Sequence, residues 1–218
     1  MSAPLSKPTG RKQKKEAKRQ ALTKAFLQFL DALGPEFLNA KEKQKTASRA
    51  TNLWLDHLLV GEGVDIASLF SHAQKTQTQS EVFVLDIHVH LVCPHHLTIA
   101  FGKAHLAYVP TGRLAGFGAL SRVVSACCSR FVLQEEATAC IAESLVKHLG
   151  AKAAVAIVEA THPCHNVIEP RAHAALSVTC STAGHAKEAK HLERSLKDRL
   201  NARQYIFQRY GTRSPQPS

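Results

Sequence analysis

The sequence predicts an α+β fold in which two antiparallel β-hairpins are separated by a pair of helices. Residues 81–92 alternate between apolar and polar side chains, as a half-exposed strand does. After a break at residues 93–96, a second strand is expected over 97–109. The strongly apolar segment 153–161 and its expected partner 174–182 predict the second hairpin. The segments between the hairpins have helical spacing, so the predicted order is strand, strand, helix, helix, strand, strand.

The region before the hairpins is expected to be a basic arm followed by helices. Residues 1–20 carry seven Lys and Arg against one Glu, and they show no apolar periodicity, which predicts a disordered arm. Residues 21–75 form a predicted helical region. It holds a first helix that Gly34-Pro35 ends and a second helix over 43–59.

Residues 81–209 are predicted to form the main domain, and residues 210–218 are predicted to form a polar tail. The two central helices are expected over 116–130 and 135–149, and a long charged helix is expected over 187–209. The alternation in the first strand predicts one apolar face and one polar face. The apolar face is Phe83, Leu85, Ile87, Val89 and Leu91, and the polar face is Asp86, His88 and His90.

Composition limits the class of protein. With 218 residues, of which 44% are hydrophobic, the chain is long enough to bury a core. No apolar run reaches the roughly 18 residues of a membrane span, and no hydrophobic stretch follows the Lys-rich N-terminus, so we expect a cytoplasmic protein with no membrane partner. The six cysteines are then expected to be reduced. The net charge of +11 would suit nucleic acid, but the basic ends contain few aromatic residues, so we expect solvated tails instead.

Cysteine and histidine gather in two short segments, one at the tip of the first hairpin and one after the third strand. Thiolate sulfur and imidazole nitrogen are ligands that zinc prefers. Cys93, His96 and Cys164 could therefore hold one ion that ties the two segments together. His95 and His162 would remain beside it as imidazoles able to move protons. On spacing alone, the alternative is a buried cysteine among scattered surface histidines.

Several motifs follow one another without interruption between about Arg49 and Thr182. They are Cys93-Pro-His-His96, Phe101-Gly-Lys-Ala-His-Leu-Ala-Tyr-Val-Pro110, Gly116 through Arg122-Val-Val, Gln134-Glu135 and Glu159-Ala-Thr-His-Pro-Cys164. Together they resemble the GTP cyclohydrolase I family. The resemblance implies a tunnelling fold, in which antiparallel sheets of several subunits join into a barrel with helices outside. It also implies a homo-oligomer, a decamer in this family, with sites between subunits.

The same resemblance implies a reaction and the residues that perform it. The family opens the imidazole ring of the guanine of GTP by hydrolysis, releases formate and gives 7,8-dihydroneopterin triphosphate. By similarity, Cys93, His96 and Cys164 bind Zn²⁺. His95 and His162 would shuttle protons, which suits a side chain that titrates near neutral pH.

Four further residues match substrate-binding positions of the family. Gln134 and Glu135 match its guanine-reading pair, and a carboxylate is a natural acceptor for the guanine N1–H and 2-amino group. Arg49 and Arg122 match its phosphate-binding arginines. Without the resemblance, Gln134-Glu135 would simply begin a helix, where acidic residues are favourable, and Arg122 would be a solvated charge.

The chain departs from the family pattern around the phosphates. Gly118-Ala119 stands where the family has a Ser-Lys pair that faces the triphosphate, and Ile168 stands where it has an arginine. Pro94 replaces a glutamate, and Arg171 follows Ile168 three residues later. Two alternatives therefore stay open. One is an enzyme of the same fold that acts on another purine with fewer phosphates, and the other is a non-catalytic, zinc-stabilised binding or assembly protein.

Overall fold

The computed structural model describes residues 10–34, 38–169 and 175–210. The chain divides into two compact units, Met1–Val60 and Gly61–Ser218. The predicted N-terminal helical region extended to residue 75, whereas residues 61–75 belong to the second unit. Among the described residues, no helix combines the length and apolar character that a membrane crossing requires.

The first unit is a pair of helices. Helix α1 spans Gly10–Ala32, and α2 spans Ala40–Leu53 and continues as the π-helix η1, Trp54–Leu58. Residues 10–20, expected within a disordered arm, lie in α1, because Lys, Arg, Gln and Ala are good helix formers. Residues 1–9 of that arm lie outside the described part. The predicted end of the first helix at Gly34 is confirmed, since α1 ends two residues earlier and Gly34 has a φ of 114°.

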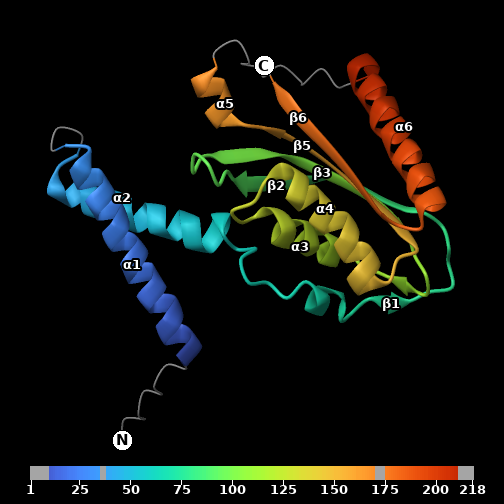
Figure 1. The fold of residues 1–218 in the computed structure, drawn as a ribbon, viewed down its shortest axis with the longest axis horizontal. Coiled ribbons are helices and arrows are strands. Elements are labelled where there is room, and N and C mark those ends of the chain that lie inside the picture. Colours follow the sequence, from blue (N-terminus) through green and yellow to red (C-terminus); the bar gives the residue numbers. More distant parts are fainter. Residues whose placement is uncertain (1–9, 35–37, 170–174, 211–218) are drawn as a thin grey trace, which may run out of the picture. The chain divides into compact units, whose positions relative to one another are not determined.

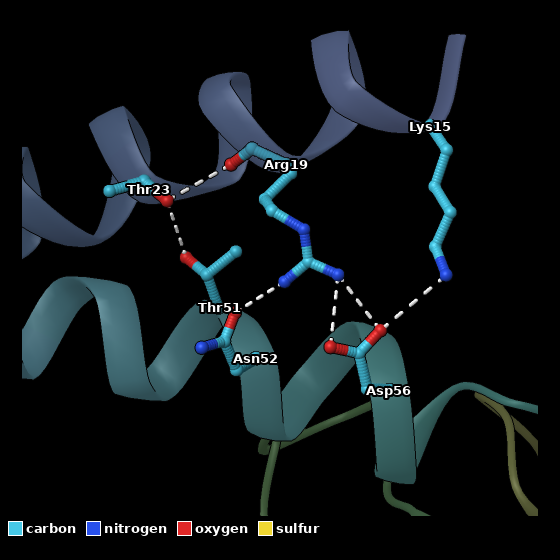
Figure 2. Close-up of polar contacts among 6 residues, drawn as sticks. All are labelled: Lys15, Arg19, Thr23, Thr51, Asn52 and Asp56. Atoms are coloured by element: carbon cyan, nitrogen blue, oxygen red, sulfur yellow. Dashed lines mark hydrogen bonds and ion pairs between the residues drawn. The ribbon is translucent and has the colours of Figure 1, made fainter. Parts of the chain in front are cut away.

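Polar side chains join α1 to α2 (Figure 2). The Arg19 guanidinium donates to both Asp56 carboxylate oxygens at 2.8 and 2.9 Å, and it also donates to Asn52. One turn along, the hydroxyls of Thr23 and Thr51 lie 2.9 Å apart. The Arg19 guanidinium beside Asp56 holds the pKa of that carboxyl below its usual value. These contacts fix which faces of the two helices meet, although both helices are rich in charged residues.

The second unit is built on a four-stranded antiparallel sheet of order β2-β3-β5-β6 (Figure 1). Two helices lie in sequence between β3 and β5, so the predicted order of strands and helices is confirmed. The strands are β2 (Val82–Val92), β3 (Ile99–Val109), β5 (Ala153–Thr161) and β6 (Leu176–Gly184). The helices are α3 (Phe117–Cys128), α4 (Gln134–Ser144) with its π-helical continuation η3 (Leu145–Leu149), and the C-terminal α6 (Ala186–Tyr210).

Each face of the sheet has its own hydrophobic core. Ala154, Ala156 and Val158 of β5 join the larger core that includes α3 and α4. Val155 and Ile157, which alternate with them, pack in a smaller core with α6. Because neighbouring residues of a strand point to opposite faces, α6 covers the face opposite to α3 and α4 (Figure 1). The all-apolar sequence of β5 follows from this burial on both sides.

The predicted apolar face of the first strand is wrong in its first half. Ile87 and the alternate residues after it pack in the larger core, but Phe83 and Leu85 pack in the core under α6. The pairing of β2 with β3 advances three residues on β2 and two on β3 between Val84 and Ile87, so a β-bulge inserts one residue. Asp86 sits there with a φ of 58°, a conformation that Asp tolerates better than most residues. Because of this extra residue, the alternate side chains before the bulge point to the opposite face of the sheet from those after it.

Short elements complete the unit. The 3₁₀-helix η2 spans Ala67–Phe70, and the two-residue strand β1, Gln74–Lys75, pairs with β4, Arg113–Leu114. Helix α5 spans Pro163–Ile168. None of these was predicted, because two to six residues are too few to show a period. The strand expected from residue 174 begins at Leu176, and residues 170–174 lie outside the described part.

The buried side chain of His105 is hydrogen-bonded to the main chain of the β-bulge, and its burial predicts how the stability of the fold depends on pH. Its side chain is 2% exposed, and its Nδ1 accepts a hydrogen bond of 3.1 Å from the Asp86 N–H, while Nε2 lies 3.5 Å from Glu159 Oε1. Burial lowers the pKa of His105 from 6.5, against the opposing effect of Glu159. Below about pH 6.5 the unfolded chain therefore takes up a proton that the folded chain resists, and the free energy of unfolding falls.

We expect His105→Asn to lose less stability than the wild type when the pH drops from 7.5 to 5.5. Asparagine has an amide oxygen near the position of Nδ1, so it can still accept from Asp86, but it does not titrate. Urea unfolding at both pH values measures the difference. His72→Asn is the matched control, because His72 is exposed. An equal pH effect in His105→Asn and wild type would contradict the prediction.

Candidate metal centre

The turn between β2 and β3 presents two of the proposed ligands. The N–H of Cys93 donates to Thr98 O at 2.9 Å, and Leu97, with a φ of 56°, donates its N–H to Cys93 O at 3.0 Å. These bonds close a tight loop, so residues three apart along the chain lie on the same side of it. Cys93 Sγ is consequently 3.7 Å from His96 Nδ1.

The third proposed ligand arrives from β5. Phe101 near the start of β3 pairs with Thr161 at the end of β5, which brings the chain after β5 beside the turn. There α5 begins with Pro163, a residue favoured in the first turn of a helix, and it carries Cys164. The ligand atoms of Cys93, His96 and Cys164 all lie within 4.8 Å of one another.

The donor set and its spacing suit zinc. Zinc binds thiolate sulfur at about 2.3 Å and imidazole nitrogen at about 2.0 Å, so ligand atoms on one tetrahedral ion lie roughly 3.5 to 3.8 Å apart. The separation of 3.7 Å between Cys93 Sγ and His96 Nδ1 falls in this range, and no pair of the ligand atoms is more than 4.8 Å apart. Two sulfurs and one nitrogen favour zinc over harder ions such as Mg²⁺, and three protein ligands leave one position of a tetrahedron for water or substrate.

A cavity of about 420 Å³ opens beside the three ligand atoms. It brings together seven of the nine residues that the sequence singled out, and its other walls are mainly apolar. The predicted residues are Cys93, His95, His96, Gln134, Glu135, His162 and Cys164. The other lining residues are Leu91, Pro94, Ala100, Val132, Leu133, His165, Ala175, Leu176 and Ser177.

The first turn of α4 supplies Gln134 and Glu135 from adjacent positions with opposite surroundings. Gln134 is 3% exposed, whereas Glu135 is exposed. Both begin a helix, as the alternative interpretation held, and both also line the cavity. The buried amide oxygen of Gln134 lies 2.8 Å from His162 Nε2. Glu135 keeps its carboxylate available for a ligand.

The two predicted phosphate arginines do not line this cavity. Arg122 lies on α3 and is exposed, and a Cβ added to Gly118 would be 3.6 Å from its Nη1. Arg49 lies on α2, in the first unit, and its role stays a prediction. Ile168, at the end of α5, is 67% exposed, and Arg171 lies outside the described residues.

Sequence reasoning missed two threonines that support the site. Thr138 on α4 and Thr179 on β6 have their hydroxyls 2.6 Å apart, and Thr179 Oγ1 also lies 3.2 Å from Gln134 Nε2. One signal was present in the sequence, because Ser177, Thr179 and Ser181 place hydroxyls at alternate positions of β6. Such a row of polar side chains on one face of a strand indicates that the face meets polar partners.

Comparison with known proteins assigns the family. Residues 22–201 match the GTP cyclohydrolase I family. The chain is similar to the GTP cyclohydrolase 1 of Ralstonia nicotianae, with 39% identity over 140 residues, which is 64% of this chain and 66% of that protein. It is also similar to the GTP cyclohydrolase 1 of Streptococcus pyogenes serotype M18, with 34% identity over 167 residues, 76% of this chain and 85% of that protein.

A solved structure gives a weaker likeness. The crystal structure of the archaeosine synthase QueF-Like in the apo form superposes with a TM-score of 0.42 and 15% sequence identity, covering 50% of this chain and 99% of that one. The family match is far more extensive, since it takes in 180 of the 218 residues, from 22 to 201. The chain therefore belongs to the GTP cyclohydrolase I family.

Proposed function

We propose that this protein is a zinc-dependent GTP cyclohydrolase I, which opens the imidazole ring of guanine by hydrolysis. The products are formate and 7,8-dihydroneopterin triphosphate. The observation that carries the proposal is the convergence of Cys93, His96 and Cys164 at a cavity that also holds His162 and Glu135. A zinc ion bound there supplies a Lewis acid that makes water a nucleophile at neutral pH.

The polar side chains and the apolar walls of the cavity have different roles in this reaction. The exposed Glu135 carboxylate accepts hydrogen bonds from the guanine N1–H and 2-amino group, which orients the ring. His95 lies between Cys93 and His96 in the sequence, and His162 lies two residues before Cys164. Both line the cavity, and their imidazoles give and take protons during ring opening and formate release. The apolar walls, including Leu91 and Val132, limit access of bulk water.

The direct test is an assay of the purified, zinc-loaded protein with GTP. We expect one formate released for each pterin formed, followed by enzymatic formate detection and by pterin fluorescence. Zinc-loaded protein that binds GTP but releases no formate would favour the non-catalytic alternative. Formate release from a guanosine compound with fewer phosphates, but not from GTP, would favour the alternative of a same-fold enzyme with a different purine substrate.

The phosphate contacts give a prediction about the Michaelis constant. Gly118 and Ala119 present no polar side chain on the first turn of α3, where Arg122 reaches toward Gly118. A hydrogen bond to a charged group contributes roughly 1.5–3 kcal/mol, or about tenfold to a hundredfold in affinity. We therefore expect GTP to be a substrate with a raised Michaelis constant, and we expect Ala119→Lys to lower that constant by about tenfold.

Kinetics with GTP, GDP and GMP on wild type, Ala119→Lys and Arg122→Ala measure this effect. Arg122→Ala should weaken GTP binding more than GMP binding, because only the longer phosphate chain gains from the guanidinium that this change removes. If the three nucleotides compete equally on the wild type, the enzyme acts on a substrate with fewer phosphates. Tight GTP binding that is indifferent to Arg122→Ala would mean that the phosphates are held elsewhere.

We also propose that the protein is a cytoplasmic homo-oligomer, a decamer by similarity to its family. Two features of the second unit support assembly. Both β2 and β6 are edge strands, and Phe101, Leu176 and Val178 are each more than half exposed. Phe101 and Leu176 both pair with Thr161, so they lie in one row across the sheet. Open edges and apolar side chains of this kind are normally covered by a partner.

Light scattering is expected to give a mass of about 240 kDa, ten times the 23.8 kDa of one chain. Phe101→Glu should shift the protein to smaller species, because a charge would be buried at the contact. A stable monomer near 24 kDa would contradict both the assembly and any site built between subunits.

A further inference from the structure

The amide group of Gln134 makes all of its hydrogen bonds within the protein. Its Nε2 lies 2.9 Å from Val158 O, 3.1 Å from Ser177 O and 3.2 Å from Thr179 Oγ1. Its Oε1 lies 2.8 Å from His162 Nε2. The residue is 3% exposed, so losing one of these partners would leave a buried polar atom unsatisfied, which costs free energy.

These partners determine which way the amide faces. Main-chain carbonyl oxygens only accept hydrogen bonds, so the amide nitrogen of Gln134 must point to Val158 O and Ser177 O. Its oxygen must then point to His162. An amide oxygen also only accepts, so His162 Nε2 must carry the hydrogen of that bond. Neutral His162 consequently has its basic lone pair on Nδ1.

Two hydroxyls hold the amide in this orientation. Thr138 Oγ1 donates to the main-chain O of Gln134 at 2.7 Å, and its hydrogen is thereby used. Thr179 Oγ1 lies 2.6 Å from Thr138 and 3.4 Å from Val158 O, so its hydrogen goes to the nearer Thr138. Its oxygen is left to accept from Gln134 Nε2, whose two hydrogens are shared among three acceptors. The chain of bonds starts and ends on Gln134. Its hydroxyls come from α4 and β6, so it also ties the helix to the strand.

We propose that Gln134 is a positioning residue that fixes the tautomer and orientation of His162, and that Thr138 and Thr179 hold Gln134 in place. In this role Gln134 does not hydrogen-bond to guanine, and Glu135 recognises the base. The inference rests on the proposed GTP cyclohydrolase function.

Gln134→Leu separates positioning from guanine recognition. Leucine is similar in size but cannot accept from His162, so kcat should fall by about a hundredfold, within the range that one acid–base group contributes. The Michaelis constant and the dissociation constant for GTP should stay within about twofold of wild type. Glu135→Gln is the matched comparison, and it should weaken GTP binding by about tenfold or more. A tenfold loss of GTP affinity in Gln134→Leu would assign Gln134 to the base and overturn the proposal.

Thr179→Val tests the supporting hydroxyls without touching the cavity, because Thr179 is not among its lining residues. We expect kcat to fall by about tenfold with unchanged zinc content and unchanged GTP affinity, and we expect Thr179→Ser to restore the rate. Residues that act as a unit have non-additive effects, so Thr179→Val should not lower further the residual rate of formate release that His162→Ala retains. An additive loss in that double variant would show a general structural effect and would contradict the proposal.

The two hypotheses fail in different ways. Absence of formate release by the wild type would refute the proposed function. GTP binding is measured independently of turnover, so a loss of GTP affinity in Gln134→Leu overturns the positioning role even if the wild type is fully active. Because Gln134 is buried, circular dichroism and zinc content serve as the folding controls, and Thr179→Val provides the milder variant if Gln134→Leu does not fold.

Discussion

Cys164→Ser is expected to abolish both zinc binding and turnover. Of the three proposed ligands, Cys93 and His96 share one turn, and Cys164 alone comes from the chain after β5. A serine hydroxyl stays protonated at neutral pH and is a much poorer zinc ligand than a thiolate. The two remaining ligands cannot close the site, so affinity should collapse, and activity should fall to the background of the assay.

Zinc per chain, measured by elemental analysis after dialysis, decides this prediction. The wild type should retain about one ion, and Cys93→Ser should behave like Cys164→Ser. Cys180→Ser is the matched control, because Cys180 is an exposed cysteine on β6 outside the ligand cluster. Full zinc occupancy in Cys164→Ser would remove Cys164 from the ligand set.

The second large effect is expected for His162→Ala, which should keep zinc and stop turnover before a pterin appears. His162 lines the cavity, but it lies outside the cluster of ligand atoms, so the ion should remain bound. Loss of an acid–base group typically costs about 10² to 10⁴ in rate. Zinc content, formate release and pterin fluorescence, measured on the same preparation, separate loss of metal from loss of proton transfer.

His165→Ala provides the comparison for His162→Ala. His165 also lines the cavity, but its side chain is exposed. We expect it to retain most of the activity. If His162→Ala turned over GTP at the wild-type rate, the proton-transfer role would pass to His165 or His95.

The sequence by itself predicted the features that depend on local pattern. Alternating and continuous apolar segments indicated the strands, and helical spacing indicated the helices. The pairing of Phe101 with Thr161 is what brings the turn after β2 to the chain after β5. Two adjacent hairpins with Cys and His at the same end already implied that meeting, so the candidate metal cluster could be predicted before its geometry was known.

The boundaries and faces that were missed depend on packing. The bulge at Asp86 adds one residue to β2, and its brace is His105 on the neighbouring strand. A period-2 pattern assumes an unbroken pleat, so it assigned Phe83 and Leu85 to the wrong core. Residues 10–20 look like a solvated arm in sequence, but in the structure Arg19 pairs with Asp56 on another helix (Figure 2).

Residue types and spacing along this chain determined which side chains could bind a metal, move protons and accept from guanine. Tertiary structure decided what those side chains contact. Gln134 is next to Glu135 in sequence, yet its amide is buried against Val158 and Thr179, while the Glu135 carboxylate is exposed. The physical reason is that a hydrogen bond between residues 24 or 45 positions apart forms only when strands and helices pack, and sequence periodicity does not encode that contact.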